Sequence, residues 1–217
     1  LELARQKQVQ GMVYLSSMEV YGQVQEPRLL AETDLGGLDS MQPRSSYPQS
    51  KRMSETLCAA YAAEYGVPAA VARLAQTFGA GVAAADNRVF AQFLRSACAG
   101  EEIVLLTKGA STRMYAYTMD AATALMTLLL KGEKGRAYNV ANKETYSSVR
   151  QMAELVAQEF STTAVPVGVR VDESTGAGKR LYPPDCHWKL DVSALEELGW
   201  KPTVGLKEMY ERMLGAM

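Results

Sequence analysis

The stretch VYLSSMEVYG, residues 13–22, joins a short apolar run to a polar tail. With Met12 in front, the run is apolar without alternation, which is typical of a strand buried on both faces of a parallel sheet. Ligands of such sheets bind at the carboxyl ends of the strands. We therefore expect the strand to leave the core at Ser16 and Ser17, with Glu19 beside them at an active-site edge.

Short apolar runs and longer amphipathic segments alternate along the rest of the chain. Strands are expected at 11–17, 67–79 (running into a loop), 101–109, 111–118, 135–141 and, as the last strand, 163–171. Helices are expected at 45–66, 87–100, 119–132, 147–160, 191–200 and 206–214. Strands that alternate with helices predict βαβ units, and thus an α/β fold with a doubly wound parallel sheet.

Two of these helices have recognisable ends. Ser45 or Ser46 is expected to cap the helix 45–66, and Gly66 to end it. Ser147 or Ser148 is expected to cap the helix 147–160. The segment before the first helix, residues 23–46, reads as a long loop, and long loops in compact domains are usually functional or disordered.

Composition excludes several classes of protein. The 217 residues are 47% hydrophobic and 22% charged, an ordinary globular composition. The net charge of -1 gives no case for nucleic acid or an anionic membrane as partner. The apolar stretches are far shorter than the ~20 residues of a membrane span. Three distant cysteines without a CxxC motif, and one histidine, argue against a disulfide framework or a metal site and favour the cytoplasm.

Tyr47 and Lys51 form a Y-x-x-x-K motif at the start of the first expected helix. A spacing of four residues puts both side chains on one face of a helix. An ammonium within ~4–6 Å of a phenol favours the phenolate form, which can act as a general base near neutral pH. By itself the motif is weak, since such pairs also occur on solvated helix edges.

The order of several motifs gives the pair its meaning. In sequence order these are VYLSSMEVYG, SSYPQSKRMSETL, ARLAQTFGAG, STRMYAYTMDAATAL, AYNVAN and DVSALEELGWKP. Together they resemble the extended short-chain dehydrogenase/reductase family, the NAD-dependent nucleotide-sugar epimerases, dehydratases and decarboxylases. The resemblance covers essentially the whole chain. Each motif alone is unspecific, but six in the right order are specific.

The resemblance implies an architecture. The expected fold is a partial Rossmann-like doubly wound parallel sheet with a small C-terminal α/β substrate-binding lobe. Residues 1–80 would form the second half of the Rossmann-like domain, and residues 81–217 mainly the substrate-binding lobe. Residues 112–146 would partly return to the Rossmann core.

The resemblance also implies catalytic roles. Tyr47 would be the base that takes the proton from the sugar hydroxyl while hydride passes to NAD. Lys51 would tune Tyr47 and bind the nicotinamide ribose. Ser17, four residues before Tyr21, matches the family's catalytic Ser/Thr and would hydrogen-bond the reacting oxygen. Without the resemblance, Ser17 would be a turn residue at a strand end.

Glu19 narrows the chemistry. Dehydratases and decarboxylases of the family often place a carboxylate two residues after the Ser/Thr, where it can move a proton at the 5-position of a 4-keto sugar. The dTDP-glucose 4,6-dehydratases have Asp-Glu where this chain has Met18-Glu19, and a methionine cannot be a general acid. UDP-glucuronate decarboxylases and GDP-mannose 4,6-dehydratases remain open, and DNRVFAQFL (86–94) favours the decarboxylase-like group. A solvated carboxylate is the alternative for Glu19.

Arginines are the expected contacts of the substrate's diphosphate, because the planar guanidinium binds two oxygens at once. Arg113 matches the family's nucleotide-sugar-binding arginine best, Arg88 lies near the start of a helix, and Arg180 matches loosely. For each of them a surface ion pair is the alternative. Asn87 is expected to hydrogen-bond the nucleotide sugar. His187 and Trp188 match no family position.

One family motif is not in the sequence. The Gly-rich turn G-x-x-G-x-x-G that cradles the NAD pyrophosphate does not occur among these residues. We therefore expect the chain to be a C-terminal fragment of an NAD-dependent enzyme, with weak or no NAD binding of its own. The alternative is a non-catalytic remnant that binds nucleotide sugars. Family members commonly form homodimers through the Tyr–Lys helix, so Leu57, Tyr61 and Tyr65 are candidates for a dimer contact.

Overall fold

The computed structural model describes residues 1–172, 174 and 185–216. Strand β1 (Met12–Ser17) is the expected strand, but it is not buried on both faces. Ser16 is buried, whereas Leu15 is 46% exposed. The expectation of full burial is wrong because β1 lies at the edge of its sheet and, among the described residues, pairs with a single strand.

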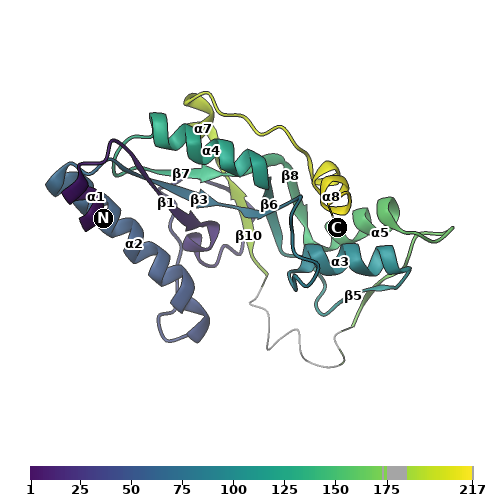
Figure 1. Cartoon of the computed structure of the whole chain (residues 1–217). Coiled ribbons are helices and arrows are strands. Elements are labelled where there is room, and N and C mark those ends of the chain that lie inside the picture. The colour runs from purple at the N-terminus through teal and green to yellow at the C-terminus, as the bar shows by residue number, and fades with distance from the viewer. Residues whose placement is uncertain (173, 175–184, 217) are drawn as a thin grey trace.

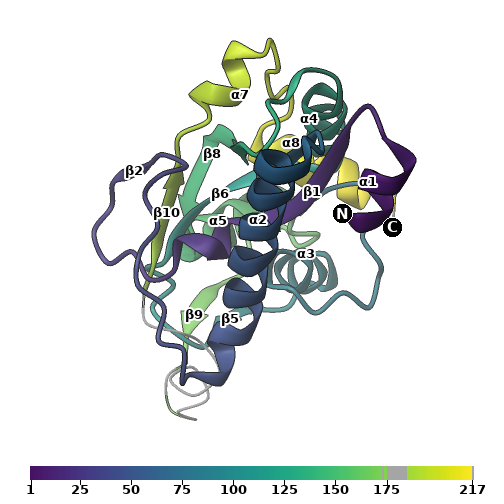
Figure 2. The ribbon, with the colours of Figure 1, turned by 90° about the vertical axis from the view of Figure 1, so that its left-hand side faces the viewer.

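The first sheet has three parallel strands in the order β1–β3–β7, with β3 spanning Ala69–Leu74 and β7 Ala137–Val140. Helix α2 (Ser46–Tyr65) covers one face and helix α4 (Thr118–Lys131) the other (Figures 1 and 2). The alternation of β3 explains this arrangement. Its residues 69 and 71 pack with Cys58 of α2, and residues 70 and 72 pack with Leu128 of α4. The expected parallel sheet with helices on both faces is confirmed.

A second sheet continues the first. Strand β4 (Gln76–Phe78) follows β3 after Ala75, and β8 (Asn142–Ser148) follows β7 after Ala141. These strands join β6 (Thr112–Tyr117), which also pairs with β10 (His187–Leu190), and β10 pairs with β2 (Leu29–Leu30). The Ala75 amide donates to the Val140 carbonyl at 2.9 Å, so pairing continues across the break.

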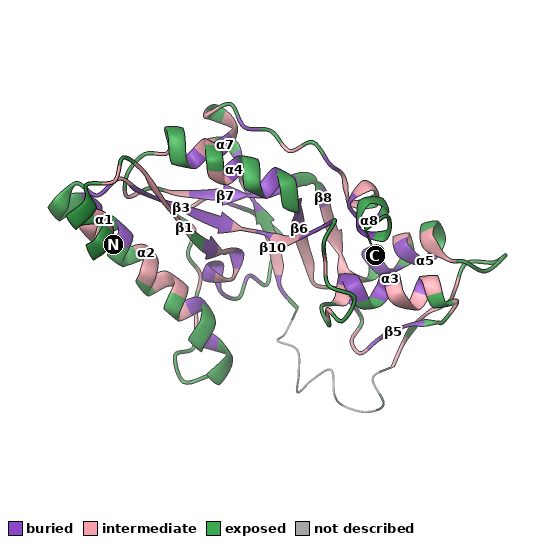
Figure 3. Ribbon diagram, in the orientation of Figure 1, coloured by how far each residue is buried: buried purple, intermediate pink, exposed green. Residues whose placement is uncertain are grey.

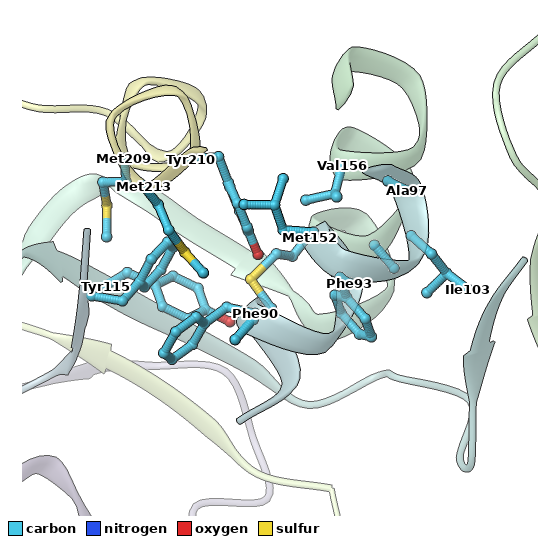
Figure 4. Packing of buried hydrophobic residues seen from close by; sticks show 14 of the residues in the cluster. Phe90, Phe93, Ala97, Ile103, Tyr115, Met152, Val156, Met209, Tyr210 and Met213 are labelled. Carbon is cyan, nitrogen blue, oxygen red and sulfur yellow. The ribbon is translucent and has the colours of Figure 1, made fainter. Parts of the chain in front are cut away.

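The C-terminal lobe packs three helices on this second sheet. Helices α3 (Val89–Ala99), α5 (Val149–Phe160) and α8 (Leu206–Leu214) surround a core that includes Phe90, Tyr115 and Tyr210 (Figure 4). The ring of Phe78 stacks on Phe90 with 4.3 Å between centroids. Strands β5 (Ile103–Leu105) and β9 (Val169–Val171) pair in parallel at the outer edge of the C-terminal lobe. Figure 3 shows the buried residues lining the inner sides of these helices. The boundary at residue 80 stays a prediction.

Most expected elements are confirmed, and the exceptions have local causes. Helix α1 (Glu2–Lys7), β2, β8 and β10 were not expected, because they are very short or carry polar residues without alternation. The segment 163–171 is not the last strand, since β10 follows it, and β5 and β6 belong to different sheets. A 3₁₀ turn, Pro43–Ser45, precedes α2, and Ser45 makes no capping hydrogen bond through its side chain.

Two other helix boundaries agree with the sequence: a glycine ends α2 and a serine begins α5. Gly66 ends α2 in the left-handed conformation, with φ of 70°. Ser148 caps α5 in a capping box with Gln151. Helix α7 (Ser193–Glu197) is shorter than the expected 191–200. Within the described residues, no helix has the length and apolar character that crossing a membrane requires.

Candidate active site

The carboxyl end of β1 turns directly into a 3₁₀ turn, Met18–Tyr21. Ser17 is the N-cap of this turn, and its Oγ accepts a hydrogen bond from the Glu19 amide at 3.2 Å. The turn ends at Gly22, whose positive φ of 67° favours glycine. Ser17 and Glu19 therefore leave the sheet at its carboxyl edge, as the sequence predicts.

Lys51 of α2 reaches this edge from the adjacent helix. Its ammonium donates to the Leu15 carbonyl at 2.8 Å. The same Nζ lies 5.7 Å from the ring centroid of Tyr47 and 5.0 Å from that of Tyr14. Tyr47 is 47% exposed. Lys51 thus connects Tyr47 to the strand that ends in Ser17. The Y-x-x-x-K motif of α2 and the carboxyl end of β1 therefore lie next to each other.

A buried ion pair fixes α2 to the sheet next to this place. Glu55 lies one turn beyond Lys51 and binds Arg73 of β3 with both oxygens, at 3.0 Å from Nε and 2.7 Å from Nη2. The side chains of Arg73 and Glu55 are 5% and 11% exposed. Ser16 donates its hydroxyl to the same carboxylate at 2.5 Å. The residue before Ser17 is therefore tied to the helix that carries Tyr47 and Lys51.

Arg73 extends this network to the turn. Its Nη1 donates to the Glu32 carbonyl at 2.6 Å and to the Tyr21 hydroxyl at 3.2 Å. Tyr21 in turn donates to Asn139 of β7 at 2.6 Å. Burial raises the pKa of Tyr21 to about 12. Burial also opposes the charge of Arg73, but the hydrogen bonds to Glu55 and the attraction of its neighbours leave the guanidinium pKa raised.

This network carries none of the residues for which the sequence predicts a role in the site, apart from its contact with the strand end. Arg73 begins the expected R-x-x-x-x-F-G-x-G motif, and Glu55 lies four residues after Lys51 on one helix face. These two positions are the features of the sequence from which the ion pair could have been inferred. An arginine inside an otherwise apolar strand requires a buried acidic partner, but the spacing along the chain does not say which carboxylate provides it.

Arg113 of β6 faces the same region from the second sheet. It pairs in register with Trp188 of β10, and its guanidinium carbon lies 5.4 Å from the indole ring. The Trp188 indole donates to the Gly22 carbonyl at 3.0 Å. Within the described residues, the Arg113 Nε is buried without a hydrogen-bond partner. A guanidinium with an unused donor is suited to bind an anion.

The other substrate-contact candidates are less clearly connected. Arg88 is exposed and forms a bidentate pair with Asp86, with Nη2 2.5 Å from Oδ2. It also lies over the Phe90 ring, so its contacts stay within its own segment. Asn87 is exposed, and its carbonyl accepts from Gln92. Arg180 lies outside the described residues. These three assignments stay predictions.

Residues 1–141 match a family model described as the NAD dependent epimerase/dehydratase family. The chain belongs to this family. A curated relative, UDP-glucuronic acid decarboxylase 6 of Arabidopsis thaliana, is 30% identical over 205 residues, which cover 93% of this chain and 56% of that protein. UDP-glucuronic acid decarboxylase 1 of Xenopus tropicalis is 31% identical over 200 residues, covering 91% of this chain and 44% of that one. The chain spans about half the length of these relatives.

Solved epimerase/dehydratase structures share the fold. UDP-glucose 4-epimerase from Thermotoga maritima, crystallised with UDP-glucose, superposes with a TM-score of 0.81 at 22% identity over 99% of this chain and 65% of that one. dTDP-glucose 4,6-dehydratase from Bacillus anthracis, in complex with NAD, gives 0.79 at 19% identity over 99% and 64%. The expected family and the Rossmann-like α/β architecture are thereby confirmed.

Proposed function

We propose that the whole protein is an NAD-dependent enzyme that modifies a nucleotide sugar through a 4-keto intermediate. The observation that carries the proposal is the position of Lys51, which bonds the end of β1 at 2.8 Å and lies beside the Tyr47 ring. The same arrangement brings a serine and a carboxylate, Ser17 and Glu19, to the exit of that strand. Membership of the family and the printed functions of the relatives support the same chemistry.

The residues present fit the nicotinamide end of NAD. Lys51 is half-buried and donates one hydrogen bond to the main chain in the described structure, so two of its three ammonium hydrogens stay available for a ribose. NAD, when bound, supplies a hydride acceptor for the carbon that carries the sugar hydroxyl. We assign the ribose contact to Lys51, with Tyr47 and Ser17 close to the nicotinamide.

The four residues then divide the proton transfers. Tyr47 takes the proton of the 4-hydroxyl, and the nearby ammonium of Lys51 stabilises the phenolate that does so. Ser17 orients the reacting oxygen by a hydrogen bond. Glu19 removes or delivers a proton at carbon 5 once carbon 4 is a ketone, because the ketone stabilises the electron pair of that carbon as an enolate. Its carboxylate accepts no hydrogen bond within the described chain, which leaves it available to substrate.

The nucleotide part of the substrate would bind beside Arg113. Its buried and unpartnered Nε supports a diphosphate contact, because a buried donor without a partner costs about 1–3 kcal/mol that a ligand oxygen can recover. Asn87, Arg88 and Arg180 remain candidates for the rest of the nucleotide sugar. The reaction after oxidation could be epimerisation, loss of water or loss of carbon dioxide. Met18-Glu19 and the names of the curated relatives favour the decarboxylase-like outcome.

Tyr47→Phe in the whole protein tests the proposal. With a panel of UDP-, dTDP- and GDP-sugars and mass analysis of products, we expect turnover to fall at least about 100-fold, because the base is removed while the ring remains. Tyr65→Phe, on the exposed end of the same helix, is the matched control and should leave turnover unchanged. Turnover that survives Tyr47→Phe would refute the assignment. Binding without any turnover would instead support a non-catalytic nucleotide-sugar module.

A further inference from the structure

Arg52, the neighbour of Lys51 on α2, makes an unusual set of contacts. Its guanidinium donates to the Val20 carbonyl from Nε at 2.8 Å and from Nη2 at 2.6 Å. Nη2 also donates to the Gly36 carbonyl at 2.6 Å. In the described part of the chain it forms no ion pair with a carboxylate. Arg52 is half-buried, and its planar guanidinium donates to main-chain carbonyls instead of a carboxylate. An arginine bonded in this way holds the backbone in place.

The backbone that it holds is the turn carrying Glu19. The Glu19 amide is bonded by Ser17, and its carbonyl accepts from Gly22 at 3.0 Å. The carbonyl of residue 20 is bonded by Arg52, and the Tyr21 carbonyl accepts from the Gly36 amide at 3.0 Å. Arg52 thus connects the α2 surface directly to the main chain of this turn and to the loop packed on it, whereas the Glu55–Arg73 pair reaches the turn through the Tyr21 side chain.

The position of the Glu19 carboxylate depends on this backbone. Because the described residues give the carboxylate no hydrogen bond, its location relative to Tyr47 is set by where the turn lies relative to α2. Lys51 binds the strand before the turn, and Arg52 binds the turn itself. Two consecutive residues of one helix therefore hold the two halves of the site at a fixed separation.

We infer that Arg52 is a positioning residue for Glu19, an inference that rests on the proposed function. Hydride transfer requires Tyr47 and Lys51, which sit on the helix itself. The later proton exchange between the Glu19 carboxyl and carbon 5 requires the turn to stay against the helix. In the decarboxylase-like outcome the bond from carbon 5 to the carboxylate breaks, carbon dioxide leaves, and the 4-keto group holds the electron pair as an enolate. The protonated Glu19 carboxyl then gives its proton to carbon 5, so its O–H bond breaks and a C–H bond forms. Arg52 serves the second step and not the first.

The test measures the two steps separately in the whole protein. Single-turnover absorbance of the reduced nicotinamide reports oxidation of the sugar, and product analysis reports the later step. For Arg52→Gln we expect the oxidation rate to stay within about twofold and product formation to fall about 10- to 100-fold, the effect of roughly 1 Å of misplacement. Arg52→Lys keeps the positive charge but not the planar guanidinium, and its rate of product formation should lie between those of the wild type and Arg52→Gln. This second variant keeps the test usable if Arg52→Gln folds poorly.

A double-variant cycle separates positioning from general stability. Glu19→Gln should slow the later step about 100-fold and leave a measurable rate. Adding Arg52→Gln should lower product formation no further, because both changes remove the same contribution. Lys131→Gln is the matched control, since Lys131 of α4 also donates to a main-chain carbonyl, that of Leu198 at 2.9 Å, away from the site. It should leave both steps unchanged.

The outcomes keep this inference distinct from the proposed function. Oxidation that survives Tyr47→Phe would remove the proposed function itself. If oxidation depends on Tyr47 but Arg52→Gln slows both steps equally, or its effect multiplies with that of Glu19→Gln, the positioning role is overturned. The positioning role would be established if Arg52→Gln slows the later step alone and does not add to the effect of Glu19→Gln.

Discussion

Arg113 combines an aromatic contact with a buried donor that makes no hydrogen bond to the described residues. Its Nε is buried without a partner in the described chain, and its guanidinium carbon lies 5.4 Å from the centroid of the Trp188 ring. This cation–π contact holds the guanidinium in place while the Nε–H stays unused. Trp188 is itself anchored to the Gly22 carbonyl. The arginine is therefore held at a defined distance from the turn that follows Ser17.

Arg113→Leu should weaken binding of nucleoside diphosphate. Titration calorimetry with UDP, dTDP and GDP would identify the diphosphate that binds, and we expect the variant to raise its Kd about 10- to 100-fold, since a hydrogen bond to a charged group contributes about 1.5–3 kcal/mol. Arg150→Leu is a matched control because Arg150 is exposed and paired with Glu154 on α5. An unchanged Kd for Arg113→Leu would exclude the diphosphate contact.

The predictability of the site differs from residue to residue. Tyr47 and Lys51 could be paired from sequence because an α-helix fixes the separation of residues four apart. Ser17 could be placed because a parallel strand presents its carboxyl end to the ligand. The Glu55–Arg73 pair could not, since it joins a helix and a strand whose relative rotation depends on packing. The contacts of Arg52 with main-chain carbonyls carry no sequence signal at all.

Helix α2 has a second side that faces away from the sheet. Its inner face buries Pro48, Cys58 and Ala62. On the outer side Met53, Leu57 and Tyr65 are 62%, 45% and 55% exposed. Several large apolar side chains exposed on one helix are typical of an interaction surface. This is the helix through which the resemblance predicts a homodimer.

A second copy of the chain is the expected occupant of that surface. In sedimentation velocity we expect the protein to be a dimer, and Leu57→Glu to shift it to monomer, because a buried charge at the contact costs more than the contact gains. Val165→Glu in the loop after α5, at a position 73% exposed, should leave the dimer intact. A monomeric protein, or equal effects of the two variants, would contradict the dimer contact.

Elements with clear ends were easier to predict than elements defined by partners. Helix α5 begins at a capping box and α2 ends at a left-handed glycine, and both signals depend on local chemistry. Strands β2 and β10 exist because they pair with each other and with β6, across long separations in sequence. Strand β1 was expected to be buried from its apolar run, but the run could not show that one edge has no neighbour in the described chain.

At the scale of the whole molecule, the two sheets are joined where β3 runs into β4 and β7 into β8, and the C-terminal segment ties the halves together. Asp120, in the first turn of α4, is buried, and its carboxylate accepts from the amides of Thr203 and Val204 at 2.9 Å and 3.1 Å. The Thr203 hydroxyl adds a bond of 2.7 Å. These residues lead directly into α8, which packs in the core of the C-terminal lobe. Asp120 thus links the helix on the first sheet to the helix that closes the second lobe.

Asp120→Ala should loosen α8 without disturbing the first sheet. Two main-chain amides would lose their acceptor, and each buried donor without a partner costs about 1–3 kcal/mol. Hydrogen exchange should therefore become faster in Leu206–Leu214, while the amides of β1 and β3 keep their protection. Thr203→Val removes only the hydroxyl bond and should give a smaller effect of the same kind. Because the tie spans the two halves, equal acceleration in both would mean that Asp120 stabilises the molecule globally instead of joining its parts.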